Sequence, residues 1–368
     1  MRLLLHERRQ TKNLRDNAQL IQFPFHNSHH GKQESFMNLI PNNQKFPKTI
    51  KFIFLFFSLN ISISCAQEYK VVIMLGQSNM VGAGRISDLN SMIQSYPAGI
   101  REKILIPPYY IWENVENNRK ESQAWKSLVA HKDTTNTIFQ YLPAFGGKTS
   151  LHGSELGLAY QLKQNRPDTN FAFIKIAVGG TTLASDWRSP SSEQDSGGYM
   201  YKRFKEGFNL AMEQAHEAVE DATIEVAGIL WMQGEQDAES ESRAKAYQDN
   251  LDNFITSVRS VVDNTNKDYI VNNPETPEVP FILGLITDQE SLDNNCTSPD
   301  IPSTYQLTYA DTIRQSQQSV CDSIERCRYF ETKDYPRACG YNAEIHYNTE
   351  GLNQMGFSFA QHLNEFLD

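Results

Sequence analysis

Residues 69–80 read YKVVIMLGQSNM and contain the first clear structural signal of the chain. The first seven residues are mostly apolar and include two valines and an isoleucine, which is typical of a strand buried on both faces of a parallel sheet. The run stops at Gly76, and a polar turn that contains Ser78 follows. Three further runs of this kind also end in polar or glycine-bearing turns: residues 171–178, 224–232 and 281–286.

Segments with apolar residues at helical spacing lie between and after these runs: residues 155–164, 200–219, 239–262, 309–320 and 351–366. We expect a fifth strand at residues 328–331. Strands that alternate with helices of this length indicate an α/β fold, in which helices cover both faces of a parallel sheet of about five strands. Residues 87–147 have no clear period, so we expect a long insertion over one end of the sheet.

The composition excludes two classes of protein. The chain has 368 residues, of which 39% are hydrophobic and 21% charged, and this balance is globular rather than disordered. Its formal net charge is −10. Because nucleic acids and anionic membranes are bound through clustered Lys and Arg, the acidic balance argues against both partners.

Residues 1–66 are expected to be a leader that ends in a signal peptide. A basic flank precedes the mostly apolar residues 52–63, a run too short to span a membrane. Ser64 and Ala66 are small residues at the −3 and −1 positions that a signal peptidase reads, so cleavage is predicted before Gln67. The protein is therefore expected to be secreted, periplasmic or held at the cell surface.

Alternatives stay open in this leader. Residues 1–36 are either a disordered extension or precede a true start at Met37. Cys65 could be retained and acylated, as in a lipoprotein, because the residues before it loosely match the small-residue run of such anchors. Residues 67–368 contain no internal repeat or flexible linker, so we expect them to form a single domain.

Four cysteines follow the leader, all in the last quarter of the chain: Cys296, Cys321, Cys327 and Cys339. An exported protein would oxidise them to two disulfides. Four cysteines allow three pairings, and the sequence alone does not choose among them.

Three strand ends carry groups suited to acyl transfer. Ser78 follows the first strand, although Met80 departs from the Gly-x-Ser-x-Gly elbow and a serine in this place is often only a helix cap. Gly179 and Gly180 end the second strand and could offer an unhindered backbone N–H to a developing oxyanion. Residues 231–237, WMQGEQD, place an amide and two carboxylates at the third strand end.

A catalytic serine needs a base, and five histidines follow the leader: His131, His152, His216, His346 and His362. His216 and His362 fall within predicted helices, while His131 lies in a polar loop and His152 just before a helix. His346 comes immediately before the last helix, where the chain can return across the strand ends. We therefore assign it as the base.

Four separated motifs together resemble the SGNH-type serine esterases, in the branch that contains sialate O-acetylesterases and family-six carbohydrate esterases such as acetyl xylan esterases. The motifs are GQSNM at residues 76–80, AVGGTTL at 177–183 with Trp187, WMQGEQD at 231–237, and IHY at 345–347 with Gly351 and Gly356 downstream. They occur in the family's order and cover roughly residues 69–362. The ordered set is far more specific than any one motif.

The resemblance implies a three-layer α/β/α, flavodoxin-like domain that removes acetyl groups from sugars without a metal or an organic cofactor. By motif, Ser78 matches the nucleophile and His346 the base. The backbone amides of Ser78 and Gly180, or Gly179, together with the Gln233 side chain, match the oxyanion hole.

The acid of the triad is where the chain departs from the wider superfamily, which carries an aspartate three residues before the histidine. Here that position is Ala343. In the family-six branch the glutamate of the Gln-Gly-Glu motif can serve instead, which points to Glu235. Glu344 and Asp237 remain candidates from their positions in the sequence.

The motifs describe the acetyl end of the substrate and leave the sugar open. Four motif residues are expected to contact the substrate: Gln77, Asn79, Thr181 and Trp187. The indoles of Trp187, Trp112 and Trp125 either stack on sugar rings or pack inside the protein. Acetylated sialic acid and acetylated plant polysaccharides such as xylan are the alternative substrates. A non-catalytic carbohydrate-binding protein descended from an esterase is the alternative from another class.

Overall fold

The computed structural model describes residues 68–85, 88, 110–115, 125–127, 151–218, 223–265, 270, 278–295, 305–338 and 344–367. Several expectations concern parts of the chain outside these ranges. They are the leader with its signal peptide and the start at Met37, the acylated Cys65, the loop histidine His131, and the cysteines Cys296 and Cys339.

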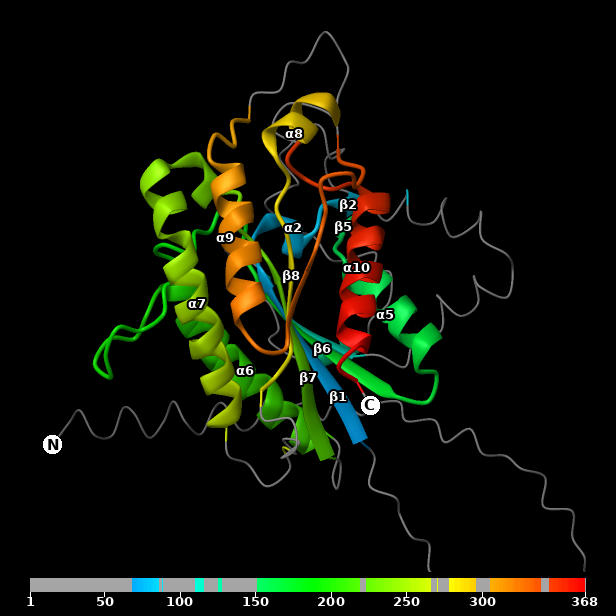
Figure 1. Ribbon diagram of the computed structural model, residues 1–368. Coiled ribbons are helices and arrows are strands. Elements are labelled where there is room, and N and C mark those ends of the chain that lie inside the picture. The colour runs from blue at the N-terminus through cyan, green and yellow to red at the C-terminus, as the bar shows by residue number, and fades with distance from the viewer. Residues whose placement is uncertain are drawn as a thin grey trace, which may run out of the picture. The chain divides into compact units, whose positions relative to one another are not determined.

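Among the described residues, a sheet of seven strands in the order β4-β3-β6-β1-β7-β8-β9 forms the centre of the fold. Figure 1 shows its strands β6, β1, β7 and β8. Its middle strands are β1 (Glu68–Gly76), β6 (Asn170–Ala177) and β7 (Thr223–Met232), followed toward one edge by β8 (Phe281–Gly284) and β9 (Cys327–Phe330). These five strands pair in parallel. They correspond to the four apolar runs and to the fifth strand expected at residues 328–331, so the prediction of a parallel sheet built from them is confirmed.

The strands β3 (Tyr110–Val115) and β4 (Trp125–Ser127) were not predicted from the sequence. The strand β3 pairs in parallel with β6, and β4 pairs antiparallel with β3. Both come from the segment 87–147, so the prediction that this segment only lies over one end of the sheet is wrong for these residues. They extend the sheet at its edge instead. A separate pair is formed by β2 (Gly84–Arg85) and β5 (Leu151–His152).

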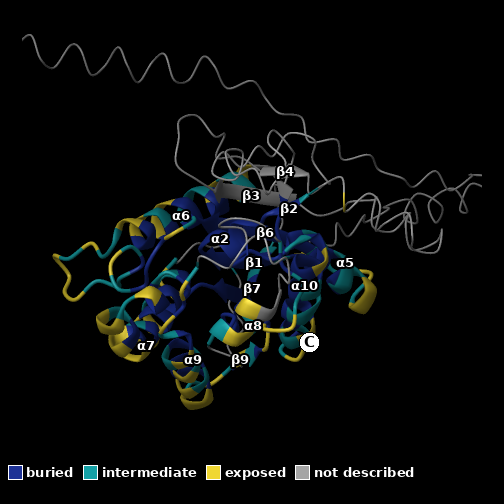
Figure 2. Cartoon of the chain, turned by 90° about the horizontal axis from the view of Figure 1, so that it is seen from above, coloured by how far each residue is buried: buried dark blue, intermediate teal, exposed yellow. Residues whose placement is uncertain are grey.

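Helices cover both faces of the sheet, as Figure 2 shows from above. The helices α5 (Glu155–Asn165) and α10 (Thr349–Asn364) pack together on one face. On the other face lie α6 (Tyr199–Ala218), α7 (Glu241–Asp263) and α9 (Ala310–Ser323). The five predicted helices all form and end within three residues of their expected bounds, because their apolar stripes face the sheet.

The register of the sheet brings three turns together. Gly76, the last residue of β1, is level with Ala177 at the end of β6 and with Met232 at the end of β7. The turns that follow these strands therefore lie side by side at the carboxyl edge of the sheet, where ligands bind in doubly wound folds. Three short helical segments follow strand ends at this edge: α2 (Ser78–Val81), η4 (Asp237–Glu239) and α8 (Gln289–Asn295).

An aromatic cluster fills the core between β7 and α7. Trp187 enters it from the loop after β6 and meets Trp231 edge-on, with ring centroids 5.2 Å apart. Phe254 of α7 lies 5.8 Å from Trp187 and 4.5 Å from Trp231. All three side chains are fully buried, and each buried aromatic pair adds about 0.5–1.5 kcal/mol beyond the area it removes from water.

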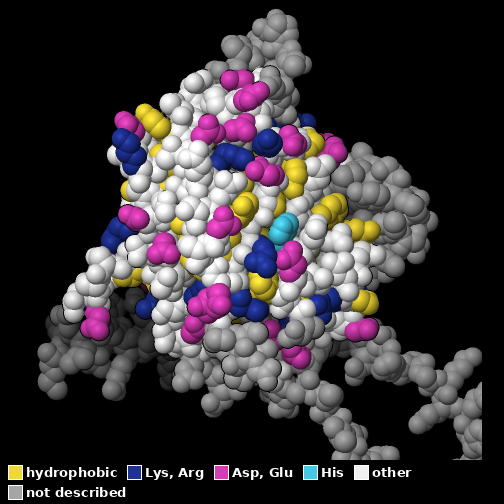
Figure 3. All heavy atoms as spheres, viewed as in Figure 1, with side chains coloured by type: hydrophobic (Ala, Val, Ile, Leu, Met, Phe, Trp, Pro, Cys, Tyr) yellow, Lys and Arg dark blue, Asp and Glu magenta, His cyan; other side chains and the backbone are white. Residues whose placement is uncertain are grey.

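The surface seen in Figure 3 carries acidic and basic side chains in mixture. Ion pairs join Arg314 to Glu331 and Arg328 to Glu365, with N–O distances of 2.6 and 2.9 Å. Such exposed pairs add little stability. Among the described residues, no helix is both long and apolar enough to cross a membrane.

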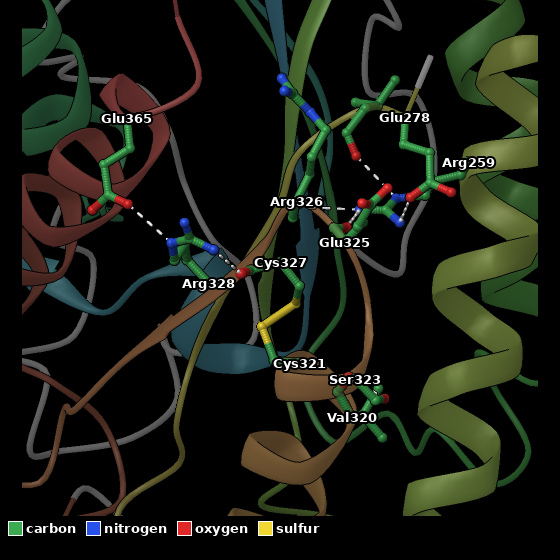
Figure 4. Close-up of a disulfide and its surroundings, with 11 residues drawn as sticks. Arg259, Glu278, Val320, Cys321, Ser323, Glu325, Arg326, Cys327, Arg328 and Glu365 are labelled. Atoms are coloured by element: carbon green, nitrogen blue, oxygen red, sulfur yellow. Dashed lines mark hydrogen bonds and ion pairs between the residues drawn. A yellow bond between two sulfur atoms is a disulfide. The ribbon is translucent and has the colours of Figure 1, made fainter. Parts of the chain in front are cut away.

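One disulfide, between Cys321 and Cys327, lies within the described part of the chain (Figure 4). It joins the last turn of α9 to the first residue of β9 across a tight turn. Arg326 in this turn has a φ of 54°, a left-handed conformation. The structure thus selects one bridge among the pairings that the sequence left open.

We expect this disulfide to stabilise the fold by about 2 kcal/mol, because closing so short a loop removes only a small part of the entropy of the unfolded chain. The Cys321→Ala/Cys327→Ala variant should lose about that free energy of unfolding in urea, with its esterase activity retained. Equal stability of the two proteins without reductant would contradict the expectation. Reductant should remove the difference between the two proteins, because it opens the bridge that only the wild type has.

Candidate active site

The turn after β1 places Ser78 at the carboxyl edge of the sheet. Gly76 has a φ of +153°, and a Cβ there would lie 2.0 Å from the Met232 carbonyl oxygen, so only glycine allows the strand end to approach β7 this closely. The Gln77 N–H donates to the same carbonyl at 2.9 Å. Ser78 is then the first residue of α2, and 7% of its surface is exposed.

Gln233 begins the turn after β7 and binds the turns around it. Its Nε2 donates to Asp237 Oδ2 at 2.6 Å, to the Thr181 carbonyl at 3.0 Å and to Gln77 Oε1 at 3.2 Å. Its Oε1 accepts from the Tyr247 hydroxyl at 3.1 Å. The two amide protons of Gln233 are therefore used inside the protein. This favours a structural role, in which Gln233 holds the turns together, rather than the role of oxyanion donor expected from the sequence.

Asp237 supports the same network from the first position of η4. Its carboxylate accepts from the backbone N–H groups of Leu183 and Ala184 at 2.8 and 3.2 Å, in addition to the Gln233 amide. Burial raises the pKa of Asp237, while these hydrogen bonds act in the opposite direction. The carboxylate is thus engaged in joining the turn after β6 to the turn after β7.

Glu235 lies two residues beyond Gln233 and is buried, with 1% of its surface exposed. Its Oε1 accepts a 2.6 Å hydrogen bond from Asn79 Nδ2, and its Oε2 has no partner among the described residues. Burial raises the pKa of Glu235 to about 6, although the Asn79 hydrogen bond and the charge of Arg337 act to lower it. A buried carboxylate with one free oxygen is suited to pair with a histidine.

The segment around His346 crosses the strand ends, as the sequence indicated. The His346 carbonyl accepts from the Ala338 N–H at 2.8 Å, and Arg337 and Tyr347 form an antiparallel bridge. From the other side, Asn79 Nδ2 donates to the Ile345 carbonyl at 3.1 Å. The structure thus brings the residues around His346, Asn79 and Glu235 into one hydrogen-bonded group.

The turn after β6 contributes Gly180, which is exposed and has a φ of +70°. A Cβ at this position would meet only Gln236 Oε1, at 3.6 Å, so the glycine is required by its backbone conformation rather than by crowding. Among the described residues, Gly180 thus lies beside the turn that carries Glu235 without crowding it.

Three residues predicted to contact the substrate are engaged elsewhere. Trp187 is fully buried in the aromatic core, so the packing alternative holds and the expectation that it contacts or stacks on the substrate is wrong. Thr181 Oγ1 donates to the Val178 carbonyl and accepts from Trp187 Nε1. Asn79, 2% exposed, uses its amide on Glu235 and the His346 segment.

Gln77, the fourth of these residues, is 3% exposed. Its Oε1 accepts from the backbone N–H groups of Gly234 and Gln236 at 3.4 and 3.3 Å. This side chain joins the turn after β1 to the turn after β7, so its carbonyl end serves the site's framework.

The other histidines within the described residues do not reach this group. His152 is buried against Gly84, and its Nδ1 lies 2.9 Å from the Gly153 carbonyl oxygen. Burial lowers its pKa. His216 and His362 lie on α6 and α10, as their sequence positions predicted.

A buried ion pair next to α2 was not predicted from the sequence. Lys175, in β6, is 2% exposed, and its Nζ donates to Glu155 Oε2 at 2.7 Å and to the Val81 carbonyl at 2.8 Å. It thus binds the carbonyl at the end of α2, whose first residue is Ser78. Burial would raise the pKa of Glu155, but the charge and hydrogen bond of Lys175 prevail and lower it. The sequence signal that could have revealed this pair is the single lysine within an apolar strand. A buried lysine needs an acidic partner.

Comparison with known proteins gives the family. The family of carbohydrate esterases described as sialic acid-specific acetylesterases matches residues 68–365. The chain belongs to this family. It is accordingly a carboxylic ester hydrolase that acts on acetylated carbohydrates, as the resemblance implied.

Two solved structures with TM-scores of 0.50 share the fold, and a third is reported with them. A protein from Arabidopsis thaliana is 19% identical, with a TM-score of 0.50, and the match covers 81% of this chain and 99% of that one. The structure of NanS is 11% identical, with a TM-score of 0.50, over 82% of this chain and 98% of that one. A carbohydrate acetylesterase from Xanthomonas citri is 13% identical, with a TM-score of 0.46, and the match covers 81% of this chain and 56% of that one. The comparison with curated proteins gave no significant match.

The raised pKa of Glu235 in this esterase predicts how its stability depends on pH. A folded pKa of about 6 lies above the ordinary 4.5, so the folded protein binds the proton more tightly than the unfolded chain does. This contribution to stability is fully present below about pH 4.5 and is lost as the pH rises through about 6, a change of about 2 kcal/mol.

The Glu235→Gln variant lacks this group, so its free energy of unfolding should fall less than that of the wild type between about pH 4 and pH 8. Urea unfolding of both proteins at the two pH values measures the difference, which we expect to be about 2 kcal/mol. An equal pH dependence in both proteins would refute the raised pKa.

Proposed function

We propose that this esterase removes O-acetyl groups through an acyl-enzyme formed on Ser78, with His346 as the base and Glu235 as the acid. The observation that carries the proposal is the grouping at the carboxyl edge. Ser78 and Glu235 follow the adjacent strands β1 and β7, and Asn79 connects Glu235 to the backbone beside His346. The free, buried Oε2 of Glu235 supports its role toward the imidazole.

The reaction runs in two halves. His346 takes the hydroxyl proton of Ser78 while the serine oxygen attacks the acetyl carbonyl, and the resulting tetrahedral intermediate expels the sugar oxygen, which takes that proton from His346. Water then attacks the acetyl-serine, gives a proton to His346, and releases acetate as Ser78 regains its proton. The carboxylate of Glu235 orients the imidazole and stabilises its charged form in both halves.

The oxyanion hole of this proposal uses backbone donors. No described residue accepts a hydrogen bond from the N–H of Ser78 or of Gly180. Both groups lie at the carboxyl edge of the sheet, in the turns after β1 and β6, which the register places side by side. The Gln233 amide joins these two turns through its hydrogen bonds to Gln77 Oε1 and to the Thr181 carbonyl. Loss of one oxyanion donor generally costs about 3–4 kcal/mol of transition-state stabilisation.

For the sugar, the description of the family favours an O-acetylated sialic acid over acetylated xylan as the first substrate to test. We expect acetate release from acetylated sialic acid to have a kcat/KM at least about tenfold above that from acetylated xylan and small acetylated neutral sugars, a difference of about 1.4 kcal/mol. Acetate is measured enzymatically on all substrates at equal acetyl concentration. Faster release from xylan would overturn this choice of sugar and leave the acyl-enzyme mechanism standing.

We also propose that the protein is exported. The apolar run at 52–63 and the small residues before Gln67 support this, and so does the disulfide between Cys321 and Cys327, since disulfides persist in oxidising compartments. Expression of the full chain in a secreting host, followed by mass spectrometry, tests it. A mature protein that begins at Gln67 agrees with a free secreted form, and a diacylglycerol on Cys65 agrees with a lipoprotein. An uncleaved chain would overturn export.

A further inference from the structure

Asn79 bonds to groups from two distant parts of the chain. Its Nδ2 donates to Glu235 Oε1 at 2.6 Å and to the Ile345 carbonyl at 3.1 Å, and its Oδ1 accepts from the Tyr347 N–H at 3.2 Å. Both polar atoms of the amide are thereby used. Because the residue is 2% exposed, no part of this amide remains for a substrate.

The two backbone contacts have a particular geometry. Asn79 binds the two backbone groups that flank His346, the Ile345 carbonyl and the Tyr347 N–H. The carbonyl of His346 itself accepts from the N–H of a third segment, that of Ala338. The backbone of His346 is therefore held from both sides.

The bond to Glu235 fixes the acid in the same way. One carboxylate oxygen is occupied by the amide, so rotation of the carboxylate is restricted and the second oxygen is the one left over. Since Asn79 follows Ser78 directly in the chain, a single residue of α2 ties the nucleophile, the base and the acid to one another.

We propose that Asn79 is a positioning residue that sets His346 and Glu235 relative to Ser78. The inference rests on the proposed function of these three residues. It replaces the substrate contact expected for Asn79 from the sequence. Asn79 itself does not touch the reacting atoms and acts through the residues it holds.

The test is the Asn79→Ala variant, with acetate release and fluorophosphonate labelling measured on the full mature chain. A misplacement of about 1 Å in a catalytic group can reduce the rate about 10²-fold, so we expect a loss of kcat on that order with KM changed less than about threefold. Labelling of Ser78 should slow by a similar factor. If Asn79→Ala does not fold, Asn79→Asp keeps the shape and the acceptor for Tyr347 but loses the donors to Glu235 and to the Ile345 carbonyl, and a loss of kcat at least as large is expected.

A double variant separates positioning from a general loss of stability. If Asn79 acts through the acid and the base, Asn79→Ala/Glu235→Gln should be at most about tenfold slower than the slower single variant, because residues that work as a unit have non-additive effects. The matched control is Cys321→Ala/Cys327→Ala, which is destabilised away from the site and should keep its kcat.

Three results would overturn the inference. They are a kcat of folded Asn79→Ala within threefold of the wild type while Glu235→Gln is impaired, a rise in KM with kcat preserved, and a loss of kcat in the disulfide control equal to that in Asn79→Ala. Full activity of Ser78→Ala or Glu235→Gln is a different outcome, since it rejects the proposed function itself.

Discussion

Replacement of Ser78 by alanine is expected to lower the rate of acetate release by at least about 10⁴-fold, or more than about 5 kcal/mol of transition-state stabilisation. The serine oxygen is the only nucleophile that the protein supplies in the proposed mechanism, and it lies at the start of α2 between the turns that carry Glu235 and Gly180. The fold should be unaffected, because the substitution removes one hydroxyl from a residue that is still partly exposed.

The measurement combines acetate release with labelling by a fluorophosphonate. The wild type should be labelled on Ser78, and the variant should not be labelled. Ser323→Ala is the matched control, because Ser323 ends α9 at the opposite edge of the sheet and its hydroxyl bonds only to the Val320 carbonyl among the described residues. Labelling at another residue, or an active Ser78→Ala protein, would reject Ser78 as the nucleophile.

The sheet was predictable because its strands are continuous apolar runs. Four of the five strands, β1, β6, β7 and β8, are almost entirely buried, so their sequences carry a strong signal by themselves, as in residues 69–75. The strands β3 and β4 gave no such signal, since they lie in a segment without a period. The pairing of β3 with β6 depends on a partner that is distant in sequence, and β4 joins the sheet only through β3.

The site was predictable where position along a strand decides it. Ser78, Gly180 and Glu235 all follow strand ends, and parallel strands in register bring such turns together. The contacts of individual side chains were harder to predict. Trp187 follows a glycine-rich turn, and nothing local shows that its indole turns into the core. Asn79 lies 266 residues from Ile345, so its hydrogen bond is visible only in the folded chain.

The identity of the acid was the least secure step from the sequence, because Ala343 occupies the position of the usual aspartate. Three carboxylates were candidates, and the structure gives each of them different partners. Asp237 accepts from Leu183, Ala184 and Gln233 and is committed to the turns. That leaves Glu235 and Glu344 to be separated by experiment.

Glu235→Gln is expected to lower kcat by about 10²- to 10⁴-fold, and Glu344→Gln by less than about tenfold, or about 1.4 kcal/mol. Asn79 can still donate to the amide oxygen of a glutamine at position 235, but the other end then presents an N–H donor where an imidazolium needs an acceptor. Glu344 instead accepts from the Tyr305 N–H at 3.3 Å, a bond that an amide oxygen can keep. Both carboxylates are buried, with 1% and 3% of their surfaces exposed, so the two substitutions are matched in chemistry and in burial. Steady-state acetate release by the two folded variants decides the assignment, and the reverse ranking would transfer the acid's role to Glu344.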